Sequence, residues 1–131
     1  MDDGGAWLLV VDDDDDVRDV ITLVLGLRGY EVVGARDGLE ALQRLRRAAR
    51  LPFAIILDLR MPRLDGLGFL GEVKKSLPLS RVPVIAVSGD RANAESAKAS
   101  GAAACLIKPV DLEVLAAEVA RFVPPPSHIG A

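Results

Sequence analysis

The feature that most constrains the fold is the apolar run Phe53-Ala54-Ile55-Ile56-Leu57, which ends in Asp58. The run is too short for a free-standing helix, and it lacks the apolar–polar alternation of a half-exposed strand. A central strand of a parallel sheet, covered by helices on both faces, is consistent with both observations. Asp58 is then predicted to lie at the carboxyl end of that strand, where open α/β sheets carry their chemistry.

Length and composition restrict the class of protein. A chain of 131 residues can bury one core without disulfides, and half of its residues are hydrophobic. The formal net charge of -3 argues against direct nucleic-acid binding, and the single Cys105 fits a reducing compartment. The acidic start lacks the basic region of a signal peptide, and no apolar run approaches the ~20 residues of a membrane span. We therefore expect a cytoplasmic domain without membrane insertion.

Four further apolar runs alternate with helical patterns along the chain. The predicted strands are Trp7–Val11, Tyr30–Ala35, Pro83–Val87 and Cys105–Ile107, besides the strand before Asp58. Helical spacing of apolar residues begins near Val17, Leu39, Leu67 and Leu112, and the segment Arg91–Ser100 is also predicted to be helical. This alternation predicts an α/β domain with a doubly wound, five-stranded parallel sheet of flavodoxin-like order 2-1-3-4-5 and helices on both faces. We expect residues 7–123 to form this domain, with terminal tails at 1–6 and 124–131.

Two of the predicted helices have features that bear on function. The helix Arg91–Ser100 is rich in Ala and Ser, so it is predicted to be thinly anchored and mobile. The helix that begins near Leu39 carries four outward-facing arginines: Arg44, Arg46, Arg47 and Arg50. These arginines are either a docking patch or a solvated helix face, and we favour the solvated face.

Polar residues end four of the five predicted strands: Asp12 with Asp13, Asp58, Ser88 and Lys108. Each has an ordinary explanation in a cap or turn, but parallel strands share one carboxyl edge, so all five residues are expected to meet there. Neighbouring carboxylates repel each other, and either protonation or a hard cation such as Mg²⁺ relieves that repulsion. Lys108 and Ser88 could then bind a phosphoryl group. Asp58 is the candidate nucleophile for an aspartyl phosphate.

Four stretches of the chain also match one family pattern: Val10–Asp13, Leu57–Gly66, Val87–Gly89 and Gly101–Pro109. On these stretches the chain resembles the receiver domains of two-component response regulators, from about residue 7 to residue 123. The resemblance implies that a histidine kinase or a phosphotransfer protein phosphorylates this chain. It also implies a signalling switch that changes its protein contacts and does not turn over external substrates.

The resemblance assigns roles to the strand-end residues. It implies that Asp58 accepts the phosphoryl group and that Asp13 and Asp58 ligate Mg²⁺ directly. The backbone carbonyl of Arg60 is the third protein ligand, and Asp12 acts largely through water. Ser88 is the switch hydroxyl that moves toward the phosphoryl group.

The remaining assignments by resemblance concern the rim around the acceptor. Lys108 is the ion-pair partner of the phosphoryl group, and its bond to Pro109 is expected to be cis. The side chains of Arg60 and Asp90 are expected to flank the path of the water that removes the phosphate.

The chain departs from the family pattern at the second switch position. Cys105 stands where the family usually has Tyr or Phe, and Ala103–Ala104 replaces an acidic pair. Both changes lie on the face that commonly carries output or dimer contacts. The sequence therefore does not predict how phosphorylation is passed to a partner, and a homodimer is one of the possibilities. We expect coupling to run through residues 88–100 instead. A redox-sensing Cys105 is the competing hypothesis, with Lys108 as the nearest cation in sequence.

Two other functions compete with the phosphorylation switch. A receiver-like docking scaffold that works independently of phosphate is one alternative, and Cys105 favours it mildly. A phosphatase that forms an aspartyl phosphate is the other, but such enzymes pair the nucleophile with a second Asp two residues on, where this chain has Arg60. No output domain is predicted after Val123, so the chain is either a stand-alone receiver or part of a longer protein.

Overall fold

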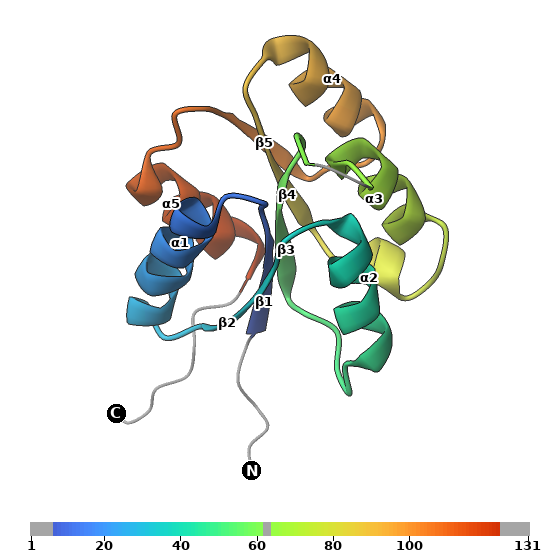
Figure 1. Ribbon diagram of the computed structural model, residues 1–131, viewed down its shortest axis with the longest axis horizontal. Helices are drawn as coiled ribbons and strands as arrows, with labels where there is room; N and C mark the ends of the chain where they lie inside the picture. The colour runs from blue at the N-terminus through green and yellow to red at the C-terminus, as the bar shows by residue number, and fades with distance from the viewer. Residues whose placement is uncertain (1–6, 62–63, 124–131) are drawn as a thin grey trace.

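Five parallel strands form one sheet in the order β2-β1-β3-β4-β5, which confirms the predicted fold class and strand order (Figure 1). The computed structural model describes residues 7–61 and 64–123. The strands are β1 (Trp7–Val11), β2 (Glu31–Ala35), β3 (Ala54–Asp58), β4 (Val84–Ser88) and β5 (Ala104–Ile107). The α-helices are α1 (Asp15–Leu27), α2 (Gly38–Arg47), α3 (Gly66–Lys74), α4 (Arg91–Ala99) and α5 (Leu112–Phe122), and a short 3₁₀ helix, η1 (Leu79–Arg81), precedes β4.

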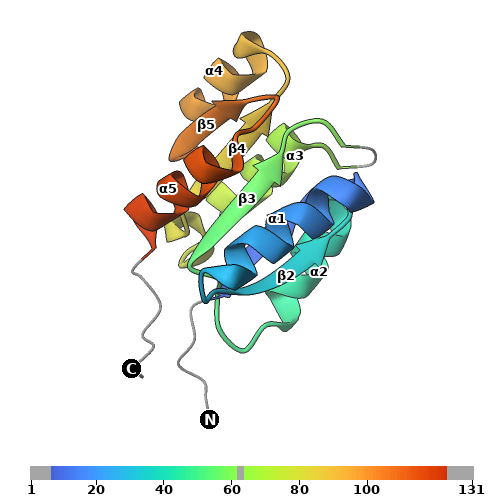
Figure 2. The same cartoon turned by 90° about the vertical axis from the view of Figure 1, so that its left-hand side faces the viewer.

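Helices cover both faces of the sheet, so the central strands are buried on both sides. Figure 1 and Figure 2 show α1 and α5 on one face, with α2, α3 and α4 on the other. Along β1, Leu8 and Val10 belong to the core cluster under α1 and α5, whereas Leu9 and Val11 belong to the cluster under α2 and α3. This two-sided burial explains why the central strands are continuously apolar.

The same residue type begins every α-helix of the described chain. The N-cap residues are Asp14, Asp37, Asp65, Asp90 and Asp111, and each side chain accepts a hydrogen bond from a backbone N–H of the first turn. An N-cap carboxylate satisfies free donors and meets the positive end of the helix dipole. Because each helix starts at the carboxyl edge of the sheet, these caps fix the loops around that edge.

Glycine ends two of the helices. Gly29 and Gly101 have φ of 98° and 107°, a left-handed conformation that ends α1 and α4 and favours glycine. Of α4, only Ala94 and Ala97 are buried, so this helix is thinly anchored as predicted. Its mobility stays a prediction.

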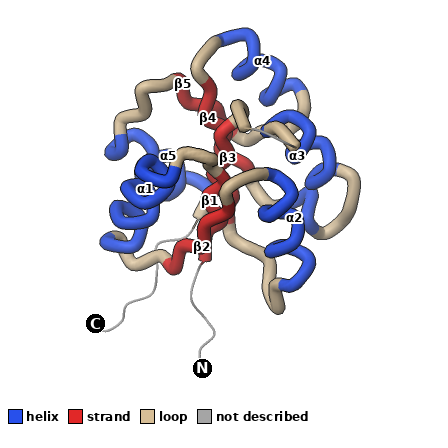
Figure 3. The backbone as a smooth tube through the Cα atoms, in the orientation of Figure 1, coloured by secondary structure: helices blue, strands red, loops and turns tan. Residues whose placement is uncertain are grey.

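Several boundaries differ from the expected ones by a single residue. β3 includes Asp58 and β4 includes Ser88, because each strand still pairs with its neighbour at that residue. The helix η1 was not predicted, and a cis bond between Leu77 and Pro78 precedes it. Figure 3 shows the strands gathered between the helices.

Some predictions fall on residues that the structure does not describe. The proposed tails, 1–6 and 124–131, lie outside the described residues, so the domain boundaries at 7 and 123 stay predictions. Residues 62 and 63 of the matching stretch after β3 lie outside them as well. Within residues 7–61 and 64–123, no helix has both the length and the apolar character needed to cross a membrane.

Candidate functional site

The carboxyl edge of the sheet brings the predicted site residues together. Asp12 follows β1 and is 4% exposed, while Asp58 ends β3 and is 3% exposed. Oxygen atoms of these two carboxylates and of the exposed Asp13 all lie within 4.8 Å of one another. The cavity between them has a volume of about 330 Å³ and also touches Arg60 and Lys108. Three carboxylates in one small cavity are a donor set that suits a hard cation.

Asp12 carries the clearest electrostatic strain of the three carboxylates. The pKa of Asp12 is raised from 3.8 to about 6, and burial is the largest cause. A hydrogen bond from the Asp14 N–H to its Oδ1, 2.9 Å long, lowers that pKa, as does the charge of Lys108. The neighbouring charges of Asp58 and Asp13 also contribute to the raised pKa. A cation in the cavity would relieve both the repulsion and the desolvation.

Asp58 has one well-bound oxygen and one open oxygen. Its Oδ1 accepts a hydrogen bond of 3.0 Å from the Arg60 N–H and lies 3.3 Å from the Lys108 ammonium. Among the described residues, no group donates a hydrogen bond to Oδ2. The carboxylate is therefore oriented on one side and available for chemistry on the other.

The loop after β3 closes tightly over the strand end. The Gly66 N–H donates to the Leu59 carbonyl at 3.2 Å, and Asp65 caps α3. A Cβ at position 66 would lie 2.4 Å from Leu59 Cα and 2.7 Å from the Asp58 carbonyl oxygen. Only glycine allows this close approach, which fixes the loop beside Asp58.

Ser88 lies at the edge as predicted, but its hydroxyl is bonded away from Asp58. Its Oγ donates to the Asp90 carbonyl at 2.7 Å and accepts from the Asp90 N–H at 3.0 Å. The Asp90 carboxylate in turn caps α4 through the Asn93 N–H at 2.8 Å. The Lys108 N–H donates to the Ser88 carbonyl at 2.8 Å, and the bond from Lys108 to Pro109 is cis as expected. Ser88 is thus tied to the start of α4.

Cys105 is half-buried in β5 and faces α4. Its thiol donates a hydrogen bond to the Ala94 carbonyl, with an Sγ–O distance of 3.2 Å. Burial raises the pKa of the thiol, and the nearby Lys98 lowers it by less. The cation that acts on this thiol is therefore Lys98, where the sequence suggested Lys108. A raised pKa disfavours the thiolate, which weakens the redox-sensor hypothesis.

One contact at this edge was missed from the sequence. The guanidinium of Arg18, in α1, donates to the Asp12 carbonyl at 2.7 Å and forms an ion pair with Asp15. The spacing of Asp15 and Arg18 along a helix was an available signal, because side chains three residues apart are neighbours there. The contact with the Asp12 backbone had no comparable signal in the sequence.

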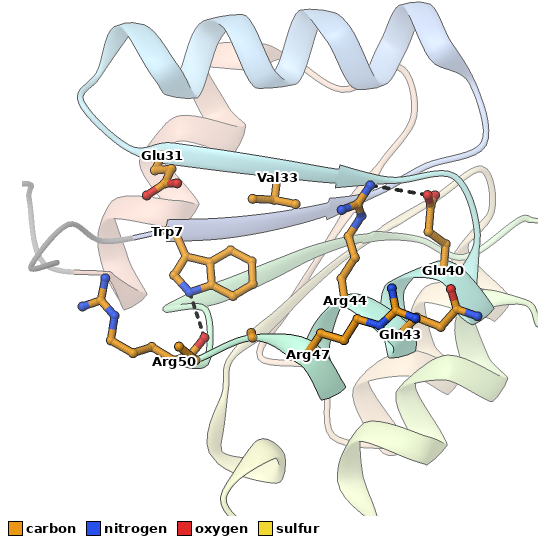
Figure 4. Close-up of a pocket in the computed structure, with 10 residues that line it drawn as sticks. Trp7, Glu31, Val33, Glu40, Gln43, Arg44, Arg47 and Arg50 are labelled. Atoms are coloured by element: carbon orange, nitrogen blue, oxygen red, sulfur yellow. Dashed lines mark hydrogen bonds and ion pairs between the residues drawn. The ribbon is translucent and has the colours of Figure 1, made fainter. Parts of the chain in front are cut away.

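The arginines of α2 and of the loop after it lie along one side of the sheet, with Arg44 at the carboxyl end of β2 and Arg50 beside Trp7, the first residue of β1 (Figure 4). There, Arg44 and Arg47 line an open cavity with Trp7, whose indole N–H donates to the Arg50 carbonyl at 3.0 Å. The Arg44 guanidinium lies 3.4 Å from the Glu40 carboxylate. All four arginines of the group are exposed, which is consistent with the favoured solvated face. The cavity extends from Trp7 and Arg50 to Arg44 and Glu40, and Asp12 is not among the residues that line it.

Comparisons with known proteins agree with the geometry. A family model for the response regulator receiver domain matches residues 8–120. The CpxR homolog of Haemophilus influenzae, a transcriptional regulatory protein, is 38% identical over 112 residues, which are 83% of this chain and 47% of that protein. The Escherichia coli transcriptional regulator NtrC is 34% identical over 123 residues, which are 94% of this chain and 25% of that protein. The chain spans less than half of the length of these relatives.

Solved structures show the same arrangement of strands and helices. The chemotaxis protein CheY4 of Vibrio cholerae superposes with a TM-score of 0.83 at 30% identity, over 92% of this chain and 100% of that chain. The receiver domain of NtrX from Brucella abortus gives a TM-score of 0.79 at 35% identity, over 88% of this chain and 96% of that chain. The chain therefore belongs to the response regulator receiver domain family of two-component signalling.

Proposed function

We propose that this chain is a phosphorylation-controlled switch in which Asp58 accepts the phosphoryl group. The observation that carries the proposal is the state of the Asp58 carboxylate. It is buried beside two further carboxylates, and the Arg60 N–H and Lys108 hold only one of its oxygens. Nucleophilic attack on a phosphoryl group requires a carboxylate that is held through one oxygen, leaves the other oxygen available, and lies next to a cavity that suits a cation.

The proposed donor is a phosphohistidine of a histidine kinase or phosphotransfer protein. An oxygen of Asp58 attacks phosphorus, an O–P bond forms, and the N–P bond breaks with its electron pair returning to the imidazole. Lys108 balances the charge gained at the edge. Asp13, Asp58, the Arg60 carbonyl and, through water, Asp12 would hold Mg²⁺. When bound, that ion would neutralise charge on the phosphoryl oxygens.

The contacts of Ser88 support a route from Asp58 to the protein surface. A phosphoryl group at Asp58 would offer the Ser88 hydroxyl a charged acceptor that is stronger than the Asp90 carbonyl. A turn of Ser88 toward that group would release the backbone of Asp90, which caps α4. Because only Ala94 and Ala97 anchor α4, its shift costs little.

An apolar groove beside the site supports docking of the phosphodonor. The groove has a volume of about 690 Å³ and runs from Asp58 past Val17 and Val20 of α1 to Val110. Val17 is 41% exposed and Val20 is 44% exposed. A donor that brings its histidine to Asp58 would cover these side chains, which favours a partner with an apolar contact surface.

The other functions have less support. One relative is a protein-glutamate methylesterase/protein-glutamine glutaminase 1 of Anaeromyxobacter dehalogenans, 48% identical over 82 residues, but the match covers 63% of this chain and 22% of that protein. That activity is therefore not transferred to this chain, and we propose no turnover of external substrates. The phosphate-independent scaffold, the homodimer and the cytoplasmic location stay predictions.

Amide hydrogen exchange with and without a small phosphodonor and Mg²⁺ tests the switch. We expect faster exchange within residues 88–100 after phosphorylation, because Ser88 no longer holds Asp90. The variant Ser88→Ala should take up phosphate but show a much smaller change there. Ser80→Ala is the matched control, since Ser80 lies in η1. An exchange pattern that is the same with and without phosphate would contradict the switch and favour the scaffold.

A further inference from the structure

Arg18 ties the first turns of α1 to the end of β1. Its Nη1 donates to the Asp12 carbonyl at 2.7 Å, and its Nη2 lies 2.5 Å from Asp15 Oδ1. The Arg18 side chain is 15% exposed, although residues 13–17 before it and Asp19 after it are all exposed. A charged side chain that is largely covered and holds a backbone carbonyl is fixed in one conformation.

A glycine in the neighbouring strand makes room for this side chain. A Cβ at Gly34 of β2 would lie 3.0 Å from Arg18 Cδ and 3.3 Å from Nε. Gly34 pairs with Val10 in an ordinary strand conformation, so the backbone does not require glycine there. Glycine inside a strand weakens the strand and often marks a close approach. Here the approaching group is the stem of Arg18.

The peptide held by Arg18 is the one that joins Asp12 to Asp13. Asp12 is fixed at its N–H by the Ala35 carbonyl, at 3.1 Å, and at its carboxylate by the Asp14 N–H. Asp13 is exposed, and its side chain forms no hydrogen bond with any described residue. The direction of the Asp13 carboxylate therefore depends on the backbone that Arg18 holds.

We propose that Arg18 is a positioning residue. Its hydrogen bond to the Asp12 carbonyl acts as a clamp on the backbone and directs the Asp12 and Asp13 carboxylates into the metal cavity. The inference rests on the proposed Mg²⁺ site. As a cation bonded to the Asp12 carbonyl, Arg18 would oppose the binding of Mg²⁺ by its charge, whereas by fixing the backbone it would favour binding. Removal of Arg18 therefore raises the affinity for Mg²⁺ if its charge dominates and lowers the affinity if its positioning role dominates.

A titration with Mg²⁺ alone, followed by the backbone amide shifts of residues 12–14 and 58–60, measures the affinity. Arg18→Met keeps an aliphatic stem and removes the clamp, and we expect affinity to fall about tenfold. Arg18→Lys should recover part of that loss, since an ammonium can still reach the carbonyl. Gly34→Ala keeps the positive charge but crowds the stem, and it should weaken binding in the same direction. Gly26→Ala is the control, because a Cβ there meets nothing within 4 Å.

Affinity in Arg18→Met that equals or exceeds that of the wild type would overturn the positioning role and leave the metal site intact. If Arg18→Met does not fold, Gly34→Ala decides: weaker binding supports the clamp, and unchanged binding overturns it. Asp13→Asn checks the site itself. If neither the wild type nor Asp13→Asn responds to Mg²⁺ at these amides, the proposed metal site fails and the clamp fails with it.

Discussion

Asp12 and Asp58 are both almost fully buried, but their surroundings prepare them for different roles. Asp58 has the ammonium of Lys108 at 3.3 Å and the Arg60 N–H at 3.0 Å on one oxygen. Asp12 has the Asp14 N–H as its hydrogen-bond donor. The contacts of Asp58 suit the proposed nucleophile, while Asp12 carries the unfavourable burial that a cation would relieve.

The stability of the metal-free protein should depend on pH through Asp12. Its pKa is about 6 in the folded chain and 3.8 as the ordinary value. Between these values the unfolded chain loses the proton before the folded chain does, so the free energy of unfolding falls as pH rises and levels off above about pH 6.

The substitution Asp12→Asn removes the free-energy cost of burying the charged Asp12 carboxylate. In chelator at pH 7.5 we expect the variant to be more stable than the wild type by roughly 1–2 kcal/mol, because water at the open edge screens part of the charge. The advantage should vanish below about pH 4. Urea unfolding across this range measures it, and an advantage that does not change with pH would contradict the explanation.

At the scale of residues, the sequence predicted which side chains meet but not how they are oriented. The rule that parallel strands share a carboxyl edge placed Asp12, Asp58, Ser88 and Lys108 together. It could not show that the Ser88 hydroxyl bonds to Asp90, because a hydroxyl can take either direction from the same strand end. Side-chain direction depends on tertiary packing, which spacing along the chain does not encode.

At the scale of elements, α4 is the helix most open to change. It buries only Ala94 and Ala97, and its N-cap residue is bonded directly to Ser88. Its low content of large apolar residues was visible in the sequence, and so was the thin anchoring that follows. The bond from Cys105 to the Ala94 carbonyl was not, because it joins residues from two different elements.

Loss of the α4 cap should loosen this helix alone. Asp90→Ala removes the hydrogen bond from the Asn93 N–H and should cost about 1 kcal/mol, with faster amide exchange over residues 91–99. Asp111→Ala, which uncaps α5, is the matched control with a similar total cost. Only Asp90→Ala should reduce the exchange response to phosphorylation, and equal responses in the two variants would argue against coupling through α4.

Cys105 should be dispensable for that response. The hydroxyl in Cys105→Ser can still donate to the Ala94 carbonyl, so the contact between β5 and α4 is kept. We expect the exchange change in residues 88–100 to survive the substitution. A response centred on position 105 and lost in the variant would show that the thiol itself transmits the signal.

At the scale of the whole molecule, the alternation of apolar runs and helical spacing was sufficient for the topology. The apolar run before Asp58 was predicted to be a central strand, and its residues do fill both sides of the sheet. The exact ends were off by one residue where a strand continues its pairing into a polar residue. Hydrophobic pattern does not record such pairing.

Mg²⁺ should raise the melting temperature of the protein as a whole. The ion would bind the folded chain, where Asp12, Asp13 and Asp58 are gathered, and not the unfolded chain, where they are apart. A concentration of about 100 times the Kd corresponds to about 2.7 kcal/mol. Thermal unfolding with added Mg²⁺ measures the effect, and Asp13→Asn should remove most of it. A melting temperature that does not respond to Mg²⁺ would count against the site.

The most direct test is intact-mass analysis of the protein after incubation with Mg²⁺ and a small phosphodonor, followed by mapping of the modified peptide. We expect the wild type to gain one phosphoryl group, on Asp58, which is lost on treatment with hydroxylamine. Asp58→Asn should gain none, because a carboxamide cannot act as the nucleophile. Phosphate uptake by Asp58→Asn at the wild-type rate, or its mapping to Asp14 or Asp65, would contradict the assignment of Asp58 as the acceptor.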